Sequence, residues 1–289
     1  MHYEGIVIRP PSEADSIILQ VTVGCSHNRC TFCGTYKDEP FRIKEAATVE
    51  EDLAFAALYC QRQNRVFLAD GDVLILPQHR LTHLLSRIRE QLPWVKRVSL
   101  YGNARSIRAK SVAQLRELKS LGLDRVYMGL ESGHDQVLDA ISKGADSDQM
   151  IEAGRRVREA GLFLSVTVLL GIAGDSGSQA HARATGRVLS EMGPNQIGVL
   201  SLMLLPNTEL YRDELAGRFR LPSPVGILHE LRTMVEHMDL RRAQLQTNHA
   251  SNYLAINARL SRDKDEVLAT IDAALAGQVA LTPEHRRRL

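Results

Sequence analysis

Cysteine is scarce in this chain, with four in 289 residues, and tryptophan occurs once. So few cysteines, behind an N-terminus with no basic start and no apolar run, argue against a disulfide-stapled secreted protein. Long apolar runs are lacking too: the longest, residues 163–173, is too short to span a bilayer and is typical of a buried strand. We therefore expect a cytoplasmic protein with no membrane partner, whose thiols stay reduced and available to metal.

Neither sign of charge dominates. Lys and Arg number 36 against 34 Asp and Glu, a formal net charge of +2. This balance does not call for nucleic acid or an anionic membrane as a partner. With 44% hydrophobic residues, the chain can bury the core of one large domain, or of one domain with an appendage.

Short apolar, β-branched runs alternate along the chain with longer amphipathic ones. The runs typical of strands are residues 16–23, 65–69, 97–100, 125–129, 163–170 and 196–203. Helical patterns between them cover residues 49–61, 78–91, 112–121, 148–160 and 179–192. Repeated βα units of this kind predict a parallel sheet, and six of them fall short of the eight that close a full barrel. The predicted fold class is α/β, a partial (β/α)6 TIM-like barrel with its chemistry at the carboxyl ends of the strands.

After Pro206 this rhythm breaks. Helices are predicted at residues 225–238 and 263–276, with a polar loop at 246–253 between them. We therefore divide the chain into a lead-in at residues 1–15, a partial-barrel core at 16–205 and a mostly helical C-terminal extension at 206–289.

Three of the four cysteines, Cys25, Cys30 and Cys33, lie on one loop directly after the first predicted strand. Iron–sulfur clusters are normally held by four cysteine thiolates. Three thiolates hold three irons of a four-iron cube and leave the fourth iron open to another ligand, which suggests catalysis rather than electron storage. A zinc site with His27 as the fourth ligand is the alternative for this loop. Cys60 lies on a predicted helix and is interpreted as a core thiol.

Phe32 stands directly before the last cysteine of the loop, and further motifs follow at residues 126–133, 137–144 and 153–161. Together these segments resemble the radical S-adenosylmethionine (SAM) superfamily over residues 16–210. The resemblance is to the branch with the Elongator catalytic subunit, the methylthiotransferases and oxygen-independent coproporphyrinogen oxidase. Four residues separate Cys25 from Cys30, where the family usually has three, and loops absorb such insertions.

The resemblance implies a [4Fe-4S] cluster on the three cysteines, with SAM chelated at the open iron. Reductive cleavage of SAM then gives a 5′-deoxyadenosyl radical that abstracts hydrogen from an organic substrate. The cofactor carries this chemistry, and the protein binds, orients and excludes side reactions. No catalytic residue is assigned beyond the cluster. The resemblance further implies an oxygen-sensitive enzyme, a small-molecule substrate and an electron donor such as flavodoxin or ferredoxin.

The resemblance also assigns cofactor contacts in the first half of the chain. Asp70, Gly71 and Asp72 fall at a turn near the methionine amino group of SAM, where glycine permits close approach and a carboxylate accepts from an ammonium. Phe32 is expected to pack on the cluster edge and the adenine. Tyr101, at the end of the third predicted strand, is expected to face the sugar or the substrate.

Further contacts are assigned around the later strands. Glu131 falls near the ribose hydroxyls, which a carboxylate accepts from. Lys143 matches a position that pairs with the methionine carboxylate, and Arg155 competes for that role. Thr167 is a hydroxyl within an apolar strand and needs a partner, so a cofactor contact is expected. Gly171 follows that strand and would give the adenine room.

The C-terminal extension contains a polar loop with Asn248, His249, Asn252 and Tyr253, which is a possible substrate-binding loop. Helix capping and surface hydration explain such a loop equally well. His181 is interpreted as a surface or capping histidine.

Two other functions stay open. Relatives of coproporphyrinogen oxidase include catalytically silent chaperones that bind haem or another tetrapyrrole on the same scaffold. A tRNA-modifying radical SAM enzyme would show a basic face near the barrel mouth and salt-sensitive RNA binding, which the near-neutral composition does not favour. The lack of further cysteines argues against a second cysteine-ligated cluster and therefore against sulfur insertion.

Overall fold

The computed structural model describes residues 1–288 and divides into two compact units. Unit 1 contains residues 1–28, 35–128 and 156–164, and unit 2 contains residues 29–34, 129–155 and 165 onward. Strand β6 (Leu123–Glu131), helix α6 (Ser147–Glu159) and strand β7 (Phe163–Leu170) each begin in one unit and end in the other.

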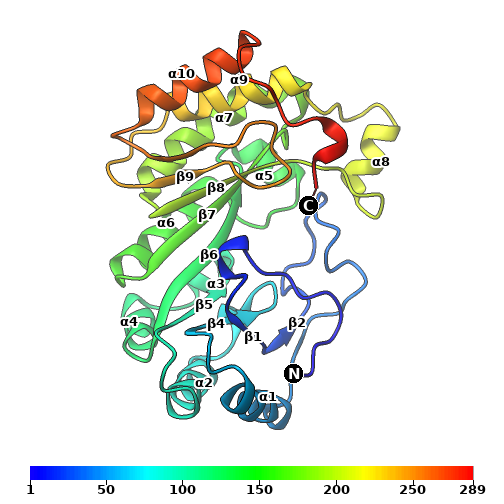
Figure 1. Cartoon of the computed structure of the whole chain (residues 1–289). Helices are drawn as coiled ribbons and strands as arrows, with labels where there is room; N and C mark the ends of the chain where they lie inside the picture. The colour runs from blue at the N-terminus through cyan, green and yellow to red at the C-terminus, as the bar shows by residue number, and fades with distance from the viewer. Residues whose placement is uncertain (289) are drawn as a thin grey trace. The chain divides into compact units, whose positions relative to one another are not determined.

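The strands of unit 1 are joined in the order β1-β4-β5-β6, and each pair is parallel. They are β1 (Ile17–Gln20), β4 (Arg65–Ala69), β5 (Arg97–Tyr101) and the first part of β6. Figure 1 shows the helices α1 (Ala46–Tyr59), α2 (Gln78–Gln91) and α4 (Val112–Ser120) along one side of these strands. Because helices cover one face and side chains fill the other, β4 is apolar and buried after Arg65, as parallel strands commonly are.

The face of the sheet turned away from the helices holds an aromatic cluster. Phe67 packs edge-on against Tyr101 and Tyr127, with ring centroids 5.2 and 6.0 Å away. Next to this cluster lies the short 3-10 helix η1 (Pro11–Glu13), whose Glu13 is buried. Glu13 accepts a hydrogen bond from the Tyr127 hydroxyl over 2.7 Å and forms an ion pair with Arg97 at 3.2 Å. The lead-in segment therefore fills the amino-terminal end of this inner face.

In unit 2 the strand order is β7-β8-β9-β10, with β7, β8 and β9 parallel and β10 antiparallel. The added strands are β8 (Gln196–Ser201), β9 (Gln244–Gln246) and β10 (Asn257–Arg259). Helices α7 (Gly174–Met192), α9 (Pro224–Glu236) and α10 (Lys264–Leu275) pack side by side against them (Figure 1). The shorter elements are α5 (Asp135–Ala140), α8 (Glu209–Leu215) and η3 (Glu284–Arg286).

The predicted α/β fold with parallel βα units is confirmed: β4, β5, β6, β7 and β8 match the predicted strands to within two residues, and the predicted helices match to within a few residues. The first predicted strand, residues 16–23, is divided into β1 and a separate short strand at Thr22–Val23 that belongs to another sheet. The C-terminal extension differs in part, because β9 and β10 extend the sheet where only helices and a loop were expected. Each of these strands has three residues and buries only its middle one. A segment this short does not show the alternation of apolar and polar residues by which a strand is predicted. The division into lead-in, core and extension stays a prediction.

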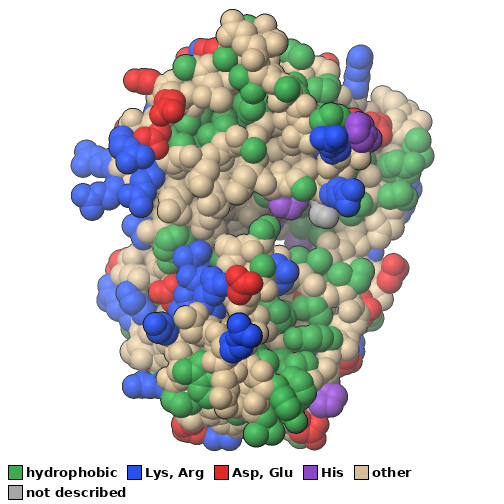
Figure 2. Space-filling model, in the orientation of Figure 1, with side chains coloured by type: hydrophobic (Ala, Val, Ile, Leu, Met, Phe, Trp, Pro, Cys, Tyr) green, Lys and Arg blue, Asp and Glu red, His purple; other side chains and the backbone are tan. Residues whose placement is uncertain are grey.

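None of the helices within residues 1–288 is long and apolar enough to cross a bilayer. Basic side chains gather on one side of unit 2, over the loops that flank β9 and β10 (Figure 2, blue, left). The exposed residues there are Arg241, Arg242, Arg259 and Arg262. They lie at the amino end of β9, which runs parallel to β8, and so at the edge opposite the carboxyl ends of these strands.

Candidate functional site

The first part of the cysteine loop, with Cys25, belongs to unit 1 and follows a short antiparallel pair, β2 (Thr22–Val23) with β3 (Arg42–Ile43). Gly24 leaves β2 in the left-handed region at φ +74°, which glycine adopts without strain. Its carbonyl accepts from Gly71 N–H over 3.3 Å. The turn after β4 is therefore bonded to the residue that precedes the first cysteine.

Gly71 lies against Cys25. A Cβ at position 71 would come within 3.0 Å of the Cys25 Cβ and of the Tyr36 ring, so the absence of a side chain lets the turn pack closely against Cys25. Beside it, the buried Asp70 accepts from the Gln20 amide over 2.7 Å and from the Tyr36 hydroxyl over 3.2 Å. Burial raises the pKa of Asp70.

Asp72 is fully buried and accepts hydrogen bonds on both carboxylate oxygens. Two donors are hydroxyls, Ser26 over 2.5 Å and Ser106 over 2.6 Å. Asn103 donates twice, from its backbone N–H and from its side-chain amide. Asn103 caps the helix α3 (Ala104–Arg108) after β5. Burial raises the pKa of Asp72 although the two hydroxyls oppose that rise. Asp72 thus ties the residue after Cys25 to the carboxyl end of β5.

Sequence analysis placed Asp70 and Asp72 near the cofactor but missed their partners. Gln20 is a polar residue at the end of a buried strand, and Asn103 stands three residues before Ser106 in a capping pattern. These two signals are visible in the sequence. Their link to a turn many residues away is not.

Residues 29–34, which carry Cys30 and Cys33, belong to unit 2. Thr31 N–H donates to the Ile141 carbonyl over 3.0 Å, and its own carbonyl accepts from Leu210 N–H over 3.0 Å. Phe32 packs against a buried apolar cluster made of Ile141, Leu169, Ile172, Leu202 and Leu210. This part of the loop is thereby attached to the ends of α5, β7 and β8.

All four cysteines are partly buried, and within residues 1–288 none is in a disulfide. Among these described residues, no group of three or more His, Cys, Asp or Glu side chains is arranged to hold a single metal ion. The donor set itself, three partly buried thiols within nine residues of sequence, fits an iron–sulfur cluster by its chemistry. Which thiols bind it stays a prediction.

At the end of β6, Glu131 and Lys143 form an ion pair. Lys143 Nζ donates to Glu131 Oε1 over 2.9 Å, and both side chains are about one-eighth exposed. A Cβ at Gly129 would lie 2.2 Å from Glu131 Oε1 and 3.0 Å from Lys143 Nζ, so glycine makes room for the pair. Glu131 adopts φ +61°, an uncommon backbone conformation for a residue with a side chain, and one that clusters at functional sites.

His181 is fully buried, so its interpretation as a surface or capping histidine was wrong. It lies on α7, with Nδ1 2.8 Å from the Ser132 hydroxyl and Nε2 3.3 Å from Glu230 Oε1. Ser132 follows Glu131 directly. Sequence reasoning missed this group because its members are distant along the chain and none stands out in an amphipathic pattern.

The other predicted contacts fall in different places. Tyr101 belongs to the aromatic cluster of unit 1, where burial raises the pKa of its hydroxyl. Thr167 is half-buried on β7 opposite Gly198, and Gly171 follows β7 at φ +82°. Arg155 is exposed on α6 and its Nε donates to the Glu191 carbonyl near the end of α7. That end leads into the start of β8, so Arg155 lies at the edge opposite the strand ends that carry Glu131 and Gly171.

The predicted substrate loop is anchored rather than open. Asn252 donates to the carbonyls of Val199 and Thr247 and accepts from the Ser201 hydroxyl at the end of β8. Tyr253 is buried and its hydroxyl donates to Glu284; burial first, and then this hydrogen bond, raise the pKa of Tyr253 to about 12. Of the four predicted residues, Asn248 is exposed and His249 is half-buried.

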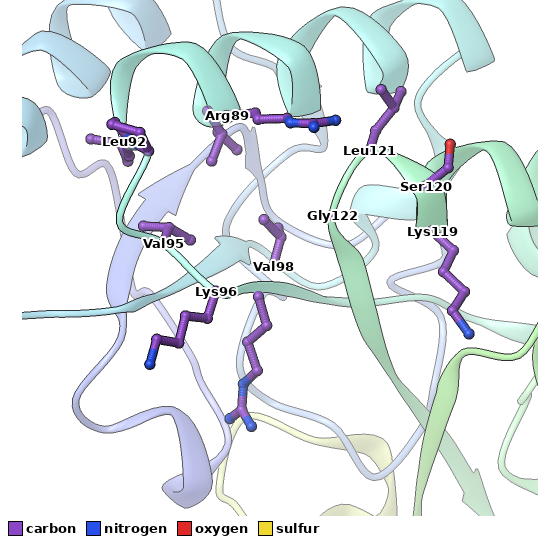
Figure 3. A pocket seen from close by; sticks show the side chains of 12 residues that line it. Arg89, Leu92, Val95, Lys96, Val98, Lys119, Ser120, Leu121 and Gly122 are labelled. Carbon is purple, nitrogen blue, oxygen red and sulfur yellow. The ribbon is translucent and has the colours of Figure 1, made fainter.

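A separate hollow of about 260 Å³ lies in unit 1, between the end of α2, the start of β5 and the turn before β6. Figure 3 shows Arg89, Lys96 and Lys119 around it. Lys119 Nζ donates to the Gly161 carbonyl over 2.5 Å. This hollow lies at the amino ends of the strands, away from Gly71 and Asp72, and takes no part in the site described above.

Comparison with known proteins identifies the family. Residues 19–182 match the radical SAM superfamily. Because this match covers more than half of the chain, the protein belongs to the radical SAM superfamily. Membership of this family implies a [4Fe-4S] cluster and SAM.

The chain is 27% identical over 176 residues to 4′-phospho-dehydrooxetanocin synthase of Priestia megaterium, a match that covers 54% of this chain and 23% of that protein. Among solved structures, coproporphyrinogen III oxidase from Escherichia coli has a TM-score of 0.56 at 18% identity, over 76% of this chain and 52% of that one. The archaeal Elp3 of Methanocaldococcus infernus has a TM-score of 0.52 at 12% identity, over 80% and 59%. The chain therefore spans only part of each of these proteins.

These solved structures share the partial TIM-barrel fold of the superfamily, so the predicted fold class is confirmed, and the family match confirms the predicted superfamily. The branch of coproporphyrinogen oxidase and the Elongator subunit stays a prediction.

Proposed function

We propose that this chain is a radical SAM enzyme that cleaves SAM reductively and abstracts hydrogen from a small organic substrate. The observation that carries the proposal is the pairing of two features on one family scaffold. One is the set of Cys25, Cys30 and Cys33 with its glycine turn, and the other is the Glu131–Lys143 pair at the end of β6.

Cys25, Cys30 and Cys33 would hold the cluster. When bound, the cluster and SAM supply the one-electron chemistry of the reaction. Gly71 keeps the turn after β4 against Cys25, and Asp72 holds Ser26 by a 2.5 Å hydrogen bond, so the first cysteine stands on a fixed backbone. Such support is what keeps metal ligands oriented.

Glu131 would accept hydrogen bonds from the ribose hydroxyls of SAM. Its Oε1 is already held by Lys143, which fixes the carboxylate orientation and compensates its charge in a largely buried setting. The second carboxylate oxygen then serves the ligand. Lys143 adds a positive charge where the methionine carboxylate would lie, and Thr167 and Gly171 from β7 would line the adenosine. The exposed Arg155 is not part of this proposal.

The substrate we propose is a small molecule, and the electron donor a flavodoxin or ferredoxin. The named relatives, a dehydrooxetanocin phosphate synthase and a coproporphyrinogen oxidase, act on small molecules by their names. The net charge of +2 and the position of the basic side chains at the amino end of β9 do not favour RNA at the carboxyl ends of the strands.

The experiment is anaerobic reconstitution with iron and sulfide, followed by dithionite and SAM. We expect an iron–sulfur chromophore and production of 5′-deoxyadenosine and methionine, measured by liquid chromatography and mass spectrometry. The variant E131Q should weaken SAM binding while keeping its iron, and E266Q, at an exposed glutamate of α10, should behave as the parent.

Zinc in the reconstituted protein, or haem binding without 5′-deoxyadenosine, would overturn the proposal. The first result would support the zinc alternative for the cysteine loop, and the second a haem or tetrapyrrole chaperone.

A further inference from the structure

A buried hydroxyl–imidazole–carboxylate chain in unit 2 connects two strand ends. Ser132, His181 and Glu230 are each fully buried. Ser132 follows β6, His181 lies on α7, and Glu230 lies on α9, which packs along α7 (Figure 1). Most buried polar groups have a hydrogen-bond partner in the protein, so the partners of these three side chains show what holds them in place.

The first link reaches the turn after β6. His181 Nδ1 lies 2.8 Å from Ser132 Oγ, and the same oxygen accepts from His134 N–H over 3.0 Å. Thr185, one turn further along α7, accepts from Gly133 N–H over 2.8 Å. The backbone directly after Glu131 is thus bonded to one face of α7, because residues four apart on a helix share a face.

The second link reaches the turn after β7. Glu230 Oε1 accepts from Gly171 N–H over 2.7 Å, and Oε2 accepts from the Ser178 hydroxyl on α7. His181 Nε2 lies 3.3 Å from Glu230 Oε1 but is poorly aligned for a hydrogen bond, so the attraction is mainly electrostatic. In the tautomer that has the ring proton on Nε2, facing this carboxylate, Nδ1 accepts from the Ser132 hydroxyl.

We propose that His181 and Glu230 are positioning residues that hold the backbone at the ends of β6 and β7 in the conformation that binds SAM. His181 acts through Ser132, which is next to Glu131. Glu230 acts through Gly171. The inference rests on the proposed function, because it gives Glu131 and Gly171 their roles. Ser132, His181 and Glu230 are fully buried, so a substrate cannot reach them, and this distinguishes the group from a hydrolase triad of similar composition. Its action is to fix two backbone turns. Glu131, at φ +61°, needs such support to keep its conformation.

Two substitutions at His181 separate the two links. In H181N the amide occupies the place of Nδ1 and can still bond Ser132, while contact with Glu230 is lost. In H181Q the amide reaches the place of Nε2 and keeps Glu230 but loses Ser132. Because Glu131 adjoins Ser132, we expect H181Q to raise the dissociation constant for SAM by at least about tenfold, and H181N to raise it less.

The measurement is anaerobic calorimetric titration of cluster-loaded protein with SAM, together with the change in the electron paramagnetic resonance spectrum of the reduced cluster on SAM addition. E230Q keeps an acceptor for Gly171 N–H and should bind SAM more tightly than E230A. V188A removes fully buried methyl groups from the same helix and controls for loss of stability alone.

Equal SAM affinity in the parent, H181Q and H181N, with only melting temperatures lowered, would overturn this inference and leave the proposed function intact. Affinity lost equally in V188A and H181Q would overturn it too, because general loosening would then explain the effect. Failure of the parent itself to bind SAM would instead count against the proposed function.

Discussion

Lys143 Nζ donates to Glu131 Oε1 over 2.9 Å, and both atoms lie within 3.0 Å of the place that a Cβ at Gly129 would occupy. The ion pair depends on that missing side chain, because the added Cβ would lie 2.2 Å from the carboxylate oxygen. A glycine within a buried strand therefore has a steric role at the site, in keeping with glycine at points of close approach.

The substitution G129A tests this relationship. We expect it to displace the Glu131 side chain and to weaken SAM binding, since the carboxylate cannot stay at 2.2 Å from a carbon atom. G198A, in strand β8 of the same sheet, is the matched control because its Cβ would meet nothing closer than 4.0 Å. Titration with SAM measures both variants. Equal affinity in G129A and G198A would show that Glu131 does not bind the ligand.

The cysteine assignment predicts a sharp difference in iron content. Alanine at Cys25, Cys30 or Cys33 should abolish the brown chromophore or destabilise it greatly, because each removes one thiolate ligand. Alanine at Cys60, which follows α1, should leave iron near the parental level. Iron per chain after anaerobic reconstitution is the measurement. A large iron loss on changing Cys60 would mean that the ligands are misassigned.

Asp72 is expected to support the cluster without binding it. D72A leaves the donors Ser26, Ser106 and Asn103 without their acceptor in a buried place, which costs about 1–3 kcal/mol of folding free energy. It should also reduce cluster retention, because Ser26 is bonded to Asp72 beside Cys25. Denaturant unfolding and iron content measure these effects, with D124A at an exposed position of β6 as control. Full iron retention in D72A would contradict this role.

His249 gives the C-terminal loop a defined pH response. Burial lowers its pKa below the ordinary value of 6.5, so the unfolded chain binds its proton more readily than the folded chain. The stability it contributes is present above pH 6.5 and is lost as pH falls through the folded pKa. We expect the parent to lose more thermal stability than H249Q between pH 7.5 and pH 5.5.

Thermal melts over that pH interval measure the difference, with H79Q at an exposed position as control. An identical pH response in the parent and H249Q would contradict the prediction.

Local patterns sufficed for the fold. The strands β4 and β7 are mostly apolar, and both match their predicted bounds. Helix α2 also has the bounds of its predicted helix. Burial on both faces of a strand and the periodicity of a helix are both visible in neighbouring residues. The cysteine loop was equally visible, since its spacing is local. Gly71 and Glu131 were assigned from motifs of consecutive residues.

The sequence by itself thus determined the family, the parallel βα architecture and the thiols that we expect to bind iron. Only the tertiary structure decided which partner each polar residue takes. Asp72 accepts hydrogen bonds from Ser26 and Asn103. His181 is buried beside Ser132 and Glu230. Arg155 lies at the edge of unit 2 opposite the strand ends of the site. The physical reason is that these pairings join residues far apart along the chain, and their free energy comes from burial that no local pattern encodes.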